Sequence, residues 1–378
     1  MEVRNIKIGG RYYMGEIFAN EEDDYSIDVP KEKRFLNTVS YDYSVEYLYN
    51  TIKKGKIVLE VPFQRKHIWK NDKASMLIES VIMNVPIPPL YFAEEDDGKW
   101  LVLDGLQRLH SIMNFYDNEF ALTKVEVLEE LRKKKYKDLP PKAKSLLDDG
   151  LLRVNIIKKD SHRDIKYDIF MRLNRGAVTL NYQELRNCLY RGNLNDAAKE
   201  LCEENKTFLA ILKQKGPHQR YQDVEFIIRY FAISDNLTKD AKGNIMISGY
   251  KGKLVAYLNE YMDQNKDCPL EKKEEYKSRF NETIQKVAIV FGVEKAFRDI
   301  STDNVKVYKT IADFIMPSFE RMDLNYVQQH KEELYQKAKA YLSNDETQTT
   351  LAIKTSDKDI INKRINGWFK ELKDEISF

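Results

Sequence analysis

The chain has 378 residues, of which 42% are hydrophobic and 32% are charged. This length exceeds what a single hydrophobic core usually serves, so one large or two associated domains are expected. The hydrophobic share excludes global disorder, and the low glycine and proline contents (15 and 10 residues) exclude a collagen-like chain. The 62 basic and 60 acidic residues leave a net charge of +2. That balance excludes a uniformly basic coat for nucleic acid, but not a local basic patch.

The sequence predicts neither a membrane span nor a secretion signal. No run approaches the roughly 18 apolar residues that a span needs, and the first residues lack an apolar core followed by a cleavage site. We therefore expect a cytoplasmic protein with no membrane partner. Cys188, Cys202 and Cys268 form neither a CxxC pair nor a disulfide framework, as expected for thiols in a reducing compartment.

The first part of the chain predicts a polar arm followed by a mixed α/β unit. Residues 1–41 are polar and form the expected arm. Apolar residues at spacings of three and four predict a helix over 43–54. Residues 57–61 predict a short strand, and a second apolar stripe predicts a helix from 71 to about 84. A prolyl segment that follows is expected to be extended.

A hairpin and a third helix are predicted next. Residues 90–93 and 100–103 are strand-like and flank a turn that contains Asp-Gly, which is typical of hairpins. An amphipathic helix is predicted from about residue 105, and a further strand over 151–157. The Lys-rich stretch 124–150 is interpreted as a mobile connection or short helices.

Beyond residue 160 the pattern is almost entirely helical. Capping boxes begin two of the helices, at Ser161-x-x-Asp164 and Asn181-x-x-Glu184. Further helices are predicted over 194–213, 221–233, 250–263, 269–291, 305–320, 325–342 and 357–374. The predicted fold class is therefore α+β, with a mixed α/β domain over 42–160 followed by a mainly helical domain over 161–378.

The strongest candidate site follows the hairpin, where a buried-looking strand ends at Asp104, turns at Gly105 and enters a helix. A helix N-terminus favours anions, and glycine lets the backbone approach a ligand closely. Arg108 can pair with a phosphate and Asp104 can hold a divalent metal, while Gln107 can orient a water or bind a base. The alternative is a plain helix cap beside a solvated arginine.

A second candidate lies after the first predicted strand, where Gln64 and Arg65 fall in a loop before a helix. Two arginines at two strand ends of one small sheet, Arg65 and Arg108, can converge on one polyphosphate. His67 is interpreted as a packing residue beside a tryptophan rather than as an acid or base.

Two further stretches carry weaker signals. Asn174 and Gly176 mark a loop between helices that either faces a ligand or is an ordinary turn. Lys133, Lys134 and Lys135 belong to a basic run that either contacts a nucleic-acid backbone or is a solvated face.

Several other chemistries are excluded. The five histidines form no HxxxH, HxH or HExxH spacing, so no zinc site is predicted. The sequence also contains no P-loop, no GxGxxG dinucleotide motif and no GxSxG nucleophile elbow.

Four motifs taken together resemble one family. FQRKHIW, PIPPLYF, VLDGLQRLHSI and FMRLNRGAVTLNYQELRN occur in this order. The ordered set is similar to the N-terminal domain of GmrSD-type, modification-dependent restriction systems, within the ParB/sulfiredoxin-like nucleotidase superfamily. The resemblance covers roughly residues 42–300. It implies a small ParB-like α/β fold followed by a helical domain, in a bacterial setting of phage defence.

The resemblance also implies a nucleotide site. An NTP would be bound, and hydrolysed with Mg²⁺, at an Asp-Gly-x-Gln-Arg motif. The residues that match are Asp104, Gly105, Gln107 and Arg108, with Gln64 and Arg65 beside them and Asn174 and Arg175 in the last motif. The alternative is a non-catalytic regulator that senses a nucleotide or DNA and recruits a separate effector.

Two features depart from the family pattern. The family usually has Gln where Leu106 stands, so this leucine either faces the core or marks weakened catalysis. Residues 301–378 contain one histidine, His330, and nothing like the C-terminal His-Asn-His nuclease of complete family members. We therefore expect a stand-alone member that does not cleave DNA by itself and works with a separate nuclease or effector protein.

Overall fold

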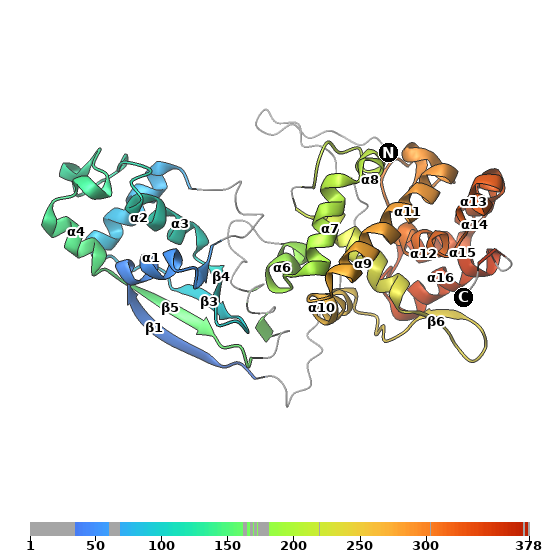
Figure 1. The fold of residues 1–378 in the computed structure, drawn as a ribbon, viewed down its shortest axis with the longest axis horizontal. Coiled ribbons are helices and arrows are strands. Elements are labelled where there is room, and N and C mark those ends of the chain that lie inside the picture. The colour runs from blue at the N-terminus through green and yellow to red at the C-terminus, as the bar shows by residue number, and fades with distance from the viewer. Residues whose placement is uncertain are drawn as a thin grey trace. The chain divides into compact units, whose positions relative to one another are not determined.

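The computed structural model of the chain describes residues 35–59, 69–161, 181–218, 220–302, 304–372 and 375–376, together with residues 165, 166, 169 and 172. These residues divide into two packed units, one that extends to Leu189 and one that begins at Tyr190. Figure 1 shows the first as a sheet with helices and the second as a group of helices with one small hairpin. The predicted fold class, a mixed α/β region followed by a mainly helical one, is confirmed.

A five-stranded mixed sheet forms the first unit, with the strand order β1-β5-β3-β4-β2. Its strands are β1 (Thr38–Ser44), β2 (Ile57–Val58), β3 (Leu90–Glu94), β4 (Trp100–Asp104) and β5 (Leu151–Ile157). Strand β4 pairs antiparallel with β3 and parallel with β2, and β3 pairs parallel with β5. The predicted hairpin and the predicted last strand are therefore confirmed.

Helices cover one face of this sheet (Figure 1). They are α1 (Val45–Lys53), α2 (Asn71–Ile82) and α3 (Leu106–Tyr116). Leu48, Ile78 and Ile112 lie on their apolar stripes and are fully buried, and each such side chain contributes about 1.5–3 kcal/mol on leaving water. The remaining α-helices that the structure bounds in this unit are α4 (Pro141–Asp148) and α6 (Tyr182–Leu189).

Strand β1 differs from the sequence prediction, which placed residues 38–41 in a polar arm and residues 43–44 in a helix. The strand pairs antiparallel with β5 over its whole length, from Thr38 opposite Ile157 to Ser44 opposite Leu151. It lies at the edge of the sheet and is mostly exposed, so its hydrophobic pattern is weak. Helix α1 begins only after it, with the Ser44 side chain as its cap.

The Lys-rich stretch before β5 folds into short helices, as one of the two sequence alternatives expected. They are η3 (Glu129–Leu131), η4 (Tyr136–Asp138) and α4. The rings of Tyr136 and Tyr116 stack with their centroids 4.2 Å apart. Both hydroxyl groups donate to the Asp148 carboxylate, at 3.0 Å and 2.6 Å. These contacts hold the stretch against α3.

A buried carboxylate ties α2 to the same stretch. Glu79 accepts hydrogen bonds from the backbone amides of Glu126, Val127 and Leu128, at 2.8 to 3.0 Å. Burial by itself raises the pKa of a carboxyl group, but the three amide donors outweigh it and hold the pKa of Glu79 below its ordinary value. The ionised side chain of Glu79 thus holds the loop around residues 126–128 in place by bonding to its backbone amides.

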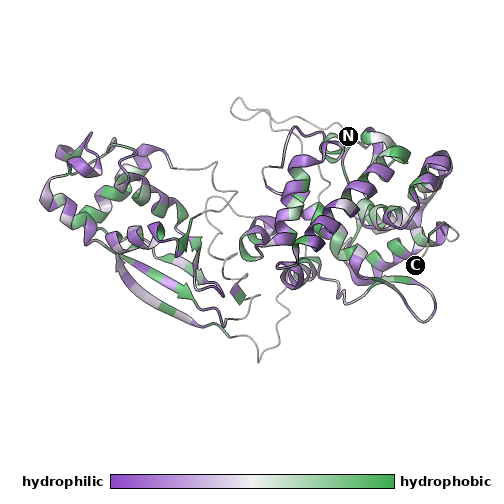
Figure 2. Cartoon of the chain, in the orientation of Figure 1, coloured by the Kyte–Doolittle hydropathy of each residue, from purple (hydrophilic) through white to green (hydrophobic). Residues whose placement is uncertain are grey.

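Helices make up most of the second unit (Figure 1). They are α7 (Asn193–Glu204), α8 (Lys206–Ile211), α9 (Gln222–Asp235), α10 (Leu254–Asn265), α11 (Leu270–Lys295), α12 (Lys309–Glu320), α13 (Leu324–Gln329), α14 (Lys331–Leu342), α15 (Asp345–Ala352) and α16 (Lys358–Glu371). A hairpin of β6 (Leu237–Lys239) and β7 (Ile245–Ile247) interrupts them. Figure 2 shows hydrophobic and hydrophilic stretches alternating along the helices of both units. No helix in the described part of the chain has the length and apolar character to cross a membrane.

Most of the predicted helices of this unit are present, with three differences. The predicted helix over 194–213 is divided at Asn205, whose side chain accepts the Phe208 amide at 2.7 Å and so caps α8. The predicted helix over 325–342 is divided at His330. The sequence pattern predicted neither α15 nor the β6–β7 hairpin.

Buried charges join three helices of the second unit. Asp313 of α12 accepts two hydrogen bonds of 2.6 Å from Arg229 of α9 and one of 3.2 Å from Arg364 of α16. The three side chains are at most 2% exposed. Arg364 also donates to the carbonyl oxygens of Thr350 and Thr355. The cluster links segments that are far apart in the sequence through one carboxylate.

Candidate functional site

The candidate site lies at the edge of the sheet where β4 and β2 end. Because the two strands pair in parallel, with Ile57 opposite Trp100 and Val58 opposite Leu101, their carboxyl ends emerge at the same edge. Asp104 is the last residue of β4. The sequence argument placed two polar motifs at two neighbouring strand ends, and the structure describes the motif that follows β4.

Gly105 turns the chain from β4 into α3 in the left-handed region, at φ +97° and ψ +8°. A Cβ atom at this position would lie 2.2 Å from Cδ2 of Leu90 on β3. Glycine is therefore required for two reasons. A residue with a side chain is strained at this φ, and its Cβ atom would collide with the neighbouring strand. This packing accounts for the glycine without any ligand.

The start of α3 has no side-chain cap. Within the described ranges no acceptor is found for the backbone amides of Leu106, Gln107 and Arg108. Unpaired amides at the first turn, together with the helix dipole, make this end of α3 favourable for an anion. Leu106 itself is buried, which confirms the reading that this leucine faces the core.

Arg108 is held by three groups of its own unit. Its guanidinium donates to Oδ2 of Asp104 at 2.7 Å and to the Pro89 carbonyl oxygen at 3.2 Å, and also to the carbonyl oxygen of Pro88. The residue is only 9% exposed. Burial lowers the pKa of Arg108 and the Asp104 carboxylate opposes that shift, so the side chain keeps its charge. Arg108 thus links the extended prolyl segment to the end of β4 and is not the solvated arginine of the plain alternative.

Asp104 remains accessible. Its side chain is 40% exposed, and the Arg108 hydrogen bond occupies Oδ2 while Oδ1 has no partner in the described part of the unit. A carboxylate oxygen is a suitable ligand for Mg²⁺, which is often bound by one or two carboxylates together with substrate phosphates. No group of three or more His, Cys, Asp or Glu side chains arranged for a metal occurs among the described residues.

Two other residues of α3 hold the ends of the neighbouring segment. Oε1 of Gln107 accepts the backbone amide of Trp69 at 3.0 Å, and His110 is hydrogen-bonded to the backbone of Leu59. Burial lowers the pKa of His110, so the imidazole is neutral at pH 7. The sequence analysis gave Gln107 a ligand role and gave His110 none; their i, i+3 spacing on one helix face was the available signal.

Four of the predicted nucleotide-binding residues, Gln64, Arg65, Asn174 and Arg175, lie outside the described residues. The structure therefore brings together Asp104, Gly105, Gln107 and Arg108 at the start of α3 and leaves the position of the other four as a prediction.

The three lysines predicted to contact nucleic acid lie between η3 and η4. Lys133 is exposed, with φ +65°, and its amide donates to the Leu122 carbonyl oxygen at 2.7 Å. Lys134 and Lys135 are half-buried. None of the three ammonium groups has an ion-pair partner among the residues that the structure describes. Contact with a nucleic-acid backbone remains a prediction for them.

The last sequence motif ends in helix α6. Asn181 and Glu184 form the predicted capping box, because each side chain accepts the other's backbone amide, at 2.8 Å and 2.6 Å. In the same first turn, Gln183 bridges Arg186 and Asn187 through two hydrogen bonds of 3.0 Å. These three polar side chains are at most 1% exposed. The sequence analysis identified the cap but not this buried polar chain.

An accessible aspartate at a strand end, a left-handed glycine and an uncapped helix start lie together at one edge of this α/β unit. Residues 45–191 match the family described as GmrSD restriction endonuclease, N-terminal domain, and this part of the chain belongs to that family. The match runs from the first residue of α1 to just beyond α6. It confirms the resemblance carried by the four motifs and links the chain to modification-dependent restriction systems. No curated protein matches the chain significantly.

Proposed function

We propose that the α/β unit binds a nucleoside triphosphate at the start of α3 and hydrolyses it. The observation that carries this proposal is the uncapped first turn of α3, which begins directly after the accessible carboxylate of Asp104. Backbone amides of Leu106 and Gln107 supply donors for phosphate oxygens, and the left-handed Gly105 leaves no side chain between them and a ligand.

The roles of the other residues follow from their contacts. Arg108 places one positive charge beside Asp104 and holds the prolyl segment at the rim of the site. Asp104 Oδ1 is the atom that would hold Mg²⁺, which neutralises phosphate charge and so lowers the barrier to phosphoryl transfer. Gln64, Arg65, Asn174 and Arg175 complete the proposed site on the strength of the family motifs alone.

A second candidate function is a non-catalytic regulator that binds a nucleotide or DNA and recruits a separate effector. The contacts of Arg108 favour it, because this guanidinium is already occupied by Asp104 and two carbonyl groups. A single accessible carboxylate also provides little general-base chemistry on its own.

A panel of the four NTPs tests the first candidate. Purified chain is incubated with each NTP and Mg²⁺, and released phosphate is measured for wild type, Asp104→Asn and the matched control Asp96→Asn, an exposed aspartate in the β3–β4 turn. We expect hydrolysis of at least one NTP, lowered about 100-fold in Asp104→Asn, which is the lower part of the range for a lost catalytic group. Equal rates in wild type and Asp104→Asn would exclude this site. Binding without hydrolysis supports the regulator.

Arg108→Ala tests the phosphate site itself. We expect nucleotide binding weaker by about 1.5–3 kcal/mol, the range for hydrogen bonds to charged groups, whether the guanidinium acts directly or through Asp104. Lys133→Ala, an exposed lysine of the same unit, is the matched control and should bind as wild type does. Unchanged affinity in Arg108→Ala contradicts any role of this residue at a phosphate.

The restriction role is proposed to depend on a separate nuclease or effector protein. Supercoiled plasmid should stay intact when incubated with the chain, Mg²⁺ and NTP. Cleavage by the wild type that is lost in Asp104→Asn would make the chain a nuclease in its own right and contradict this division of labour.

A further inference from the structure

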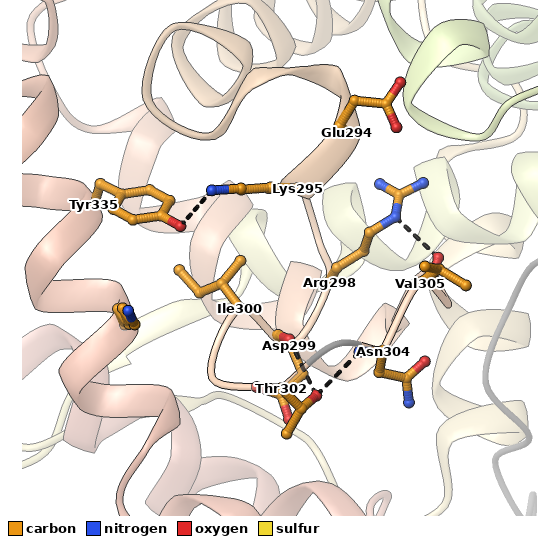
Figure 3. Close-up of a pocket in the computed structure, with 10 residues that line it drawn as sticks. Glu294, Lys295, Arg298, Asp299, Ile300, Thr302, Asn304, Val305 and Tyr335 are labelled. Atoms are coloured by element: carbon orange, nitrogen blue, oxygen red, sulfur yellow. Dashed lines mark hydrogen bonds between the residues drawn. The ribbon is translucent and has the colours of Figure 1, made fainter.

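The helical unit contains a pocket at the end of α11 that is lined by three basic and two acidic residues. The pocket has a volume of about 320 Å³ and lies between the last turn of α11, the loop around residues 298–305 and one face of α14 (Figure 3). Gly292, at φ +62° and ψ +168°, breaks the helix just before this point. The volume lies at the lower end of the range for sites that bind small molecules.

Three donor groups of two helices meet in this pocket. The Lys295 ammonium of α11 donates to the Tyr335 hydroxyl of α14 at 3.0 Å, and Figure 3 shows the two side chains pointing at each other. Lys339 lies one helical turn beyond Tyr335 and also lines the pocket. Because the Tyr335 oxygen accepts the lysine, its own proton is free to be donated outward. Lys295 keeps two further N–H groups, and the Lys339 ammonium group has no hydrogen-bond or ion-pair partner in the described part of the chain.

Two acidic residues line the pocket, Glu294 and Asp299, and the carboxylate of each has a partner outside the lysines of the pocket. The carboxylate of Asp299 accepts Ser301 and Gln348, and the residue is only 6% exposed. Glu294 forms an ion pair with Lys213 at 3.1 Å. Neither carboxylate forms an ion pair with Lys295 or Lys339 in the described part of the chain, whereas Glu332 interacts electrostatically with Lys295.

Arg298 adds a buried positive charge behind the pocket. Its guanidinium donates to the carbonyl oxygens of Val305, Val293, Ala296 and Ile211, at 2.8 to 3.3 Å. No carboxylate within the described ranges bonds to it. The carbonyl dipoles solvate this charge, and the Glu294 carboxylate also interacts with it electrostatically.

We propose that this pocket binds a small molecule that carries a phosphate or diphosphate group. A phosphate oxygen accepts hydrogen bonds only, and the free groups of Lys295, Lys339 and Tyr335 are all donors. Ile300 and Val305 line the same pocket and provide apolar contact for the organic part of such a molecule. The site is separate from the nucleotide site proposed at α3, since all of its residues belong to the second unit.

Calorimetric titration of the full chain at low salt tests this site, with pyrophosphate, ribose 5-phosphate and ribose as probes. We expect pyrophosphate and ribose 5-phosphate to bind and ribose not to bind. Lys295→Gln and Lys339→Gln should each weaken binding about fivefold to tenfold, as expected for one charge-assisted hydrogen bond in an open site. The double variant should lose this site and keep only the binding that the start of α3 contributes. Tyr335→Phe should weaken it less than either lysine variant.

Matched variants keep the test specific. Lys331→Gln changes an exposed lysine at the first turn of α14, outside the pocket, and should bind as wild type does. Asp104→Asn should also leave this binding unchanged. The proposal is wrong if wild type shows no binding up to about 10 mM, an affinity below the usual range of specific sites. It is equally wrong if the double lysine variant binds as wild type does, or if binding is lost only in Asp104→Asn, which would place it at α3.

Discussion

Two Asp–Arg ion pairs, one from each unit of the protein, differ in their accessibility. In the α/β unit, Arg108 bonds to Asp104 at the end of β4, where the carboxylate is 40% exposed. In the helical unit, Asp313 bonds to Arg229 and Arg364, and all three side chains are at most 2% exposed.

The difference shows how the same chemical pair serves two purposes. A closed cluster has no room for a ligand, so its charges can only join helices to one another. The Asp104–Arg108 pair is partly exposed, so one carboxylate oxygen of Asp104 and the first backbone amides of α3 remain available to a ligand. We therefore expect substitutions in the closed cluster to change stability alone, and substitutions at the open pair to change ligand binding as well.

The closed cluster should show the largest effect. Asp313→Asn removes the carboxylate that Arg229 and Arg364 share, and loss of one partner from a buried ion pair costs about 3–5 kcal/mol. Urea unfolding is followed by the fluorescence of Trp368, the only tryptophan from residue 190 onward. Asp359→Asn, an exposed carboxylate of α16, serves as control and should change stability by less than about 0.5 kcal/mol. A loss of stability below about 1 kcal/mol in Asp313→Asn would show that the two buried arginines do not need this carboxylate for stability.

Gly105→Ala should show the next largest effect, in the α/β unit. An alanine at φ +97° is strained by about 1–2 kcal/mol, and its Cβ would also collide with Leu90, which adds about 1–3 kcal/mol. Gly98→Ala is the matched control, because Gly98 has φ +80° but open space around it. Tryptophan fluorescence, to which Trp69 and Trp100 of this unit contribute, follows the unfolding. Equal losses for both variants would contradict the role of the Leu90 contact.

Glu79→Gln should destabilise the α/β unit by about 1–3 kcal/mol at pH 7, since three backbone amides lose a charged acceptor. The folded-state pKa of Glu79 is depressed, so its contribution is fully present above the unfolded-state value of about 4.3 and is lost as pH falls through the folded pKa. The difference between wild type and Glu79→Gln should therefore shrink below about pH 4. A difference that is the same at pH 7 and pH 3 would contradict the ionised state of this carboxyl group.

Gln107→Ala should show the smallest effect, about 0.5–1.5 kcal/mol for one neutral hydrogen bond. The change should be local, because this side chain holds the Trp69 amide. Hydrogen exchange read by mass spectrometry should become faster at Trp69 in Gln107→Ala and stay unchanged in Asn114→Ala, a half-buried residue of the same helix. Unchanged exchange at Trp69 would show that the segment is held by other contacts.

Strong local patterns in the sequence were enough to predict much of the fold. The apolar run of β4, the Asp-Gly turn before it and the amphipathic pattern of α3 are each complete within a few residues, so the hairpin and helix were predicted correctly. The capping box of Asn181 and Glu184 was also readable, because both partners lie within one helical turn. The motif order identified the family for the same reason, since it needs only the sequence.

Features that depend on distant partners could not be predicted in this way. Strand β1 is polar and exposed, and it is a strand because β5, more than a hundred residues later, pairs with it. The β6–β7 hairpin is short, and two of its backbone amides, those of Ile245 and Ile247, donate to Asn366 and Asn362 of α16. Neither the β1–β5 pairing nor the contacts of β7 with α16 can be read from a short stretch of sequence.

The sequence by itself determined which residues stand at the end of β4: an aspartate, a glycine required by the turn, and an arginine one helical turn further on. Only the tertiary structure decided how they are used. The approach of β3 excludes any side chain at Gly105, and the carbonyl oxygens of Pro88 and Pro89 engage Arg108. These partners lie on other strands and segments. Packing, and not the motif, therefore decides which hydrogen-bonding groups of Asp104 and Arg108 are used within the protein and which remain available to a ligand.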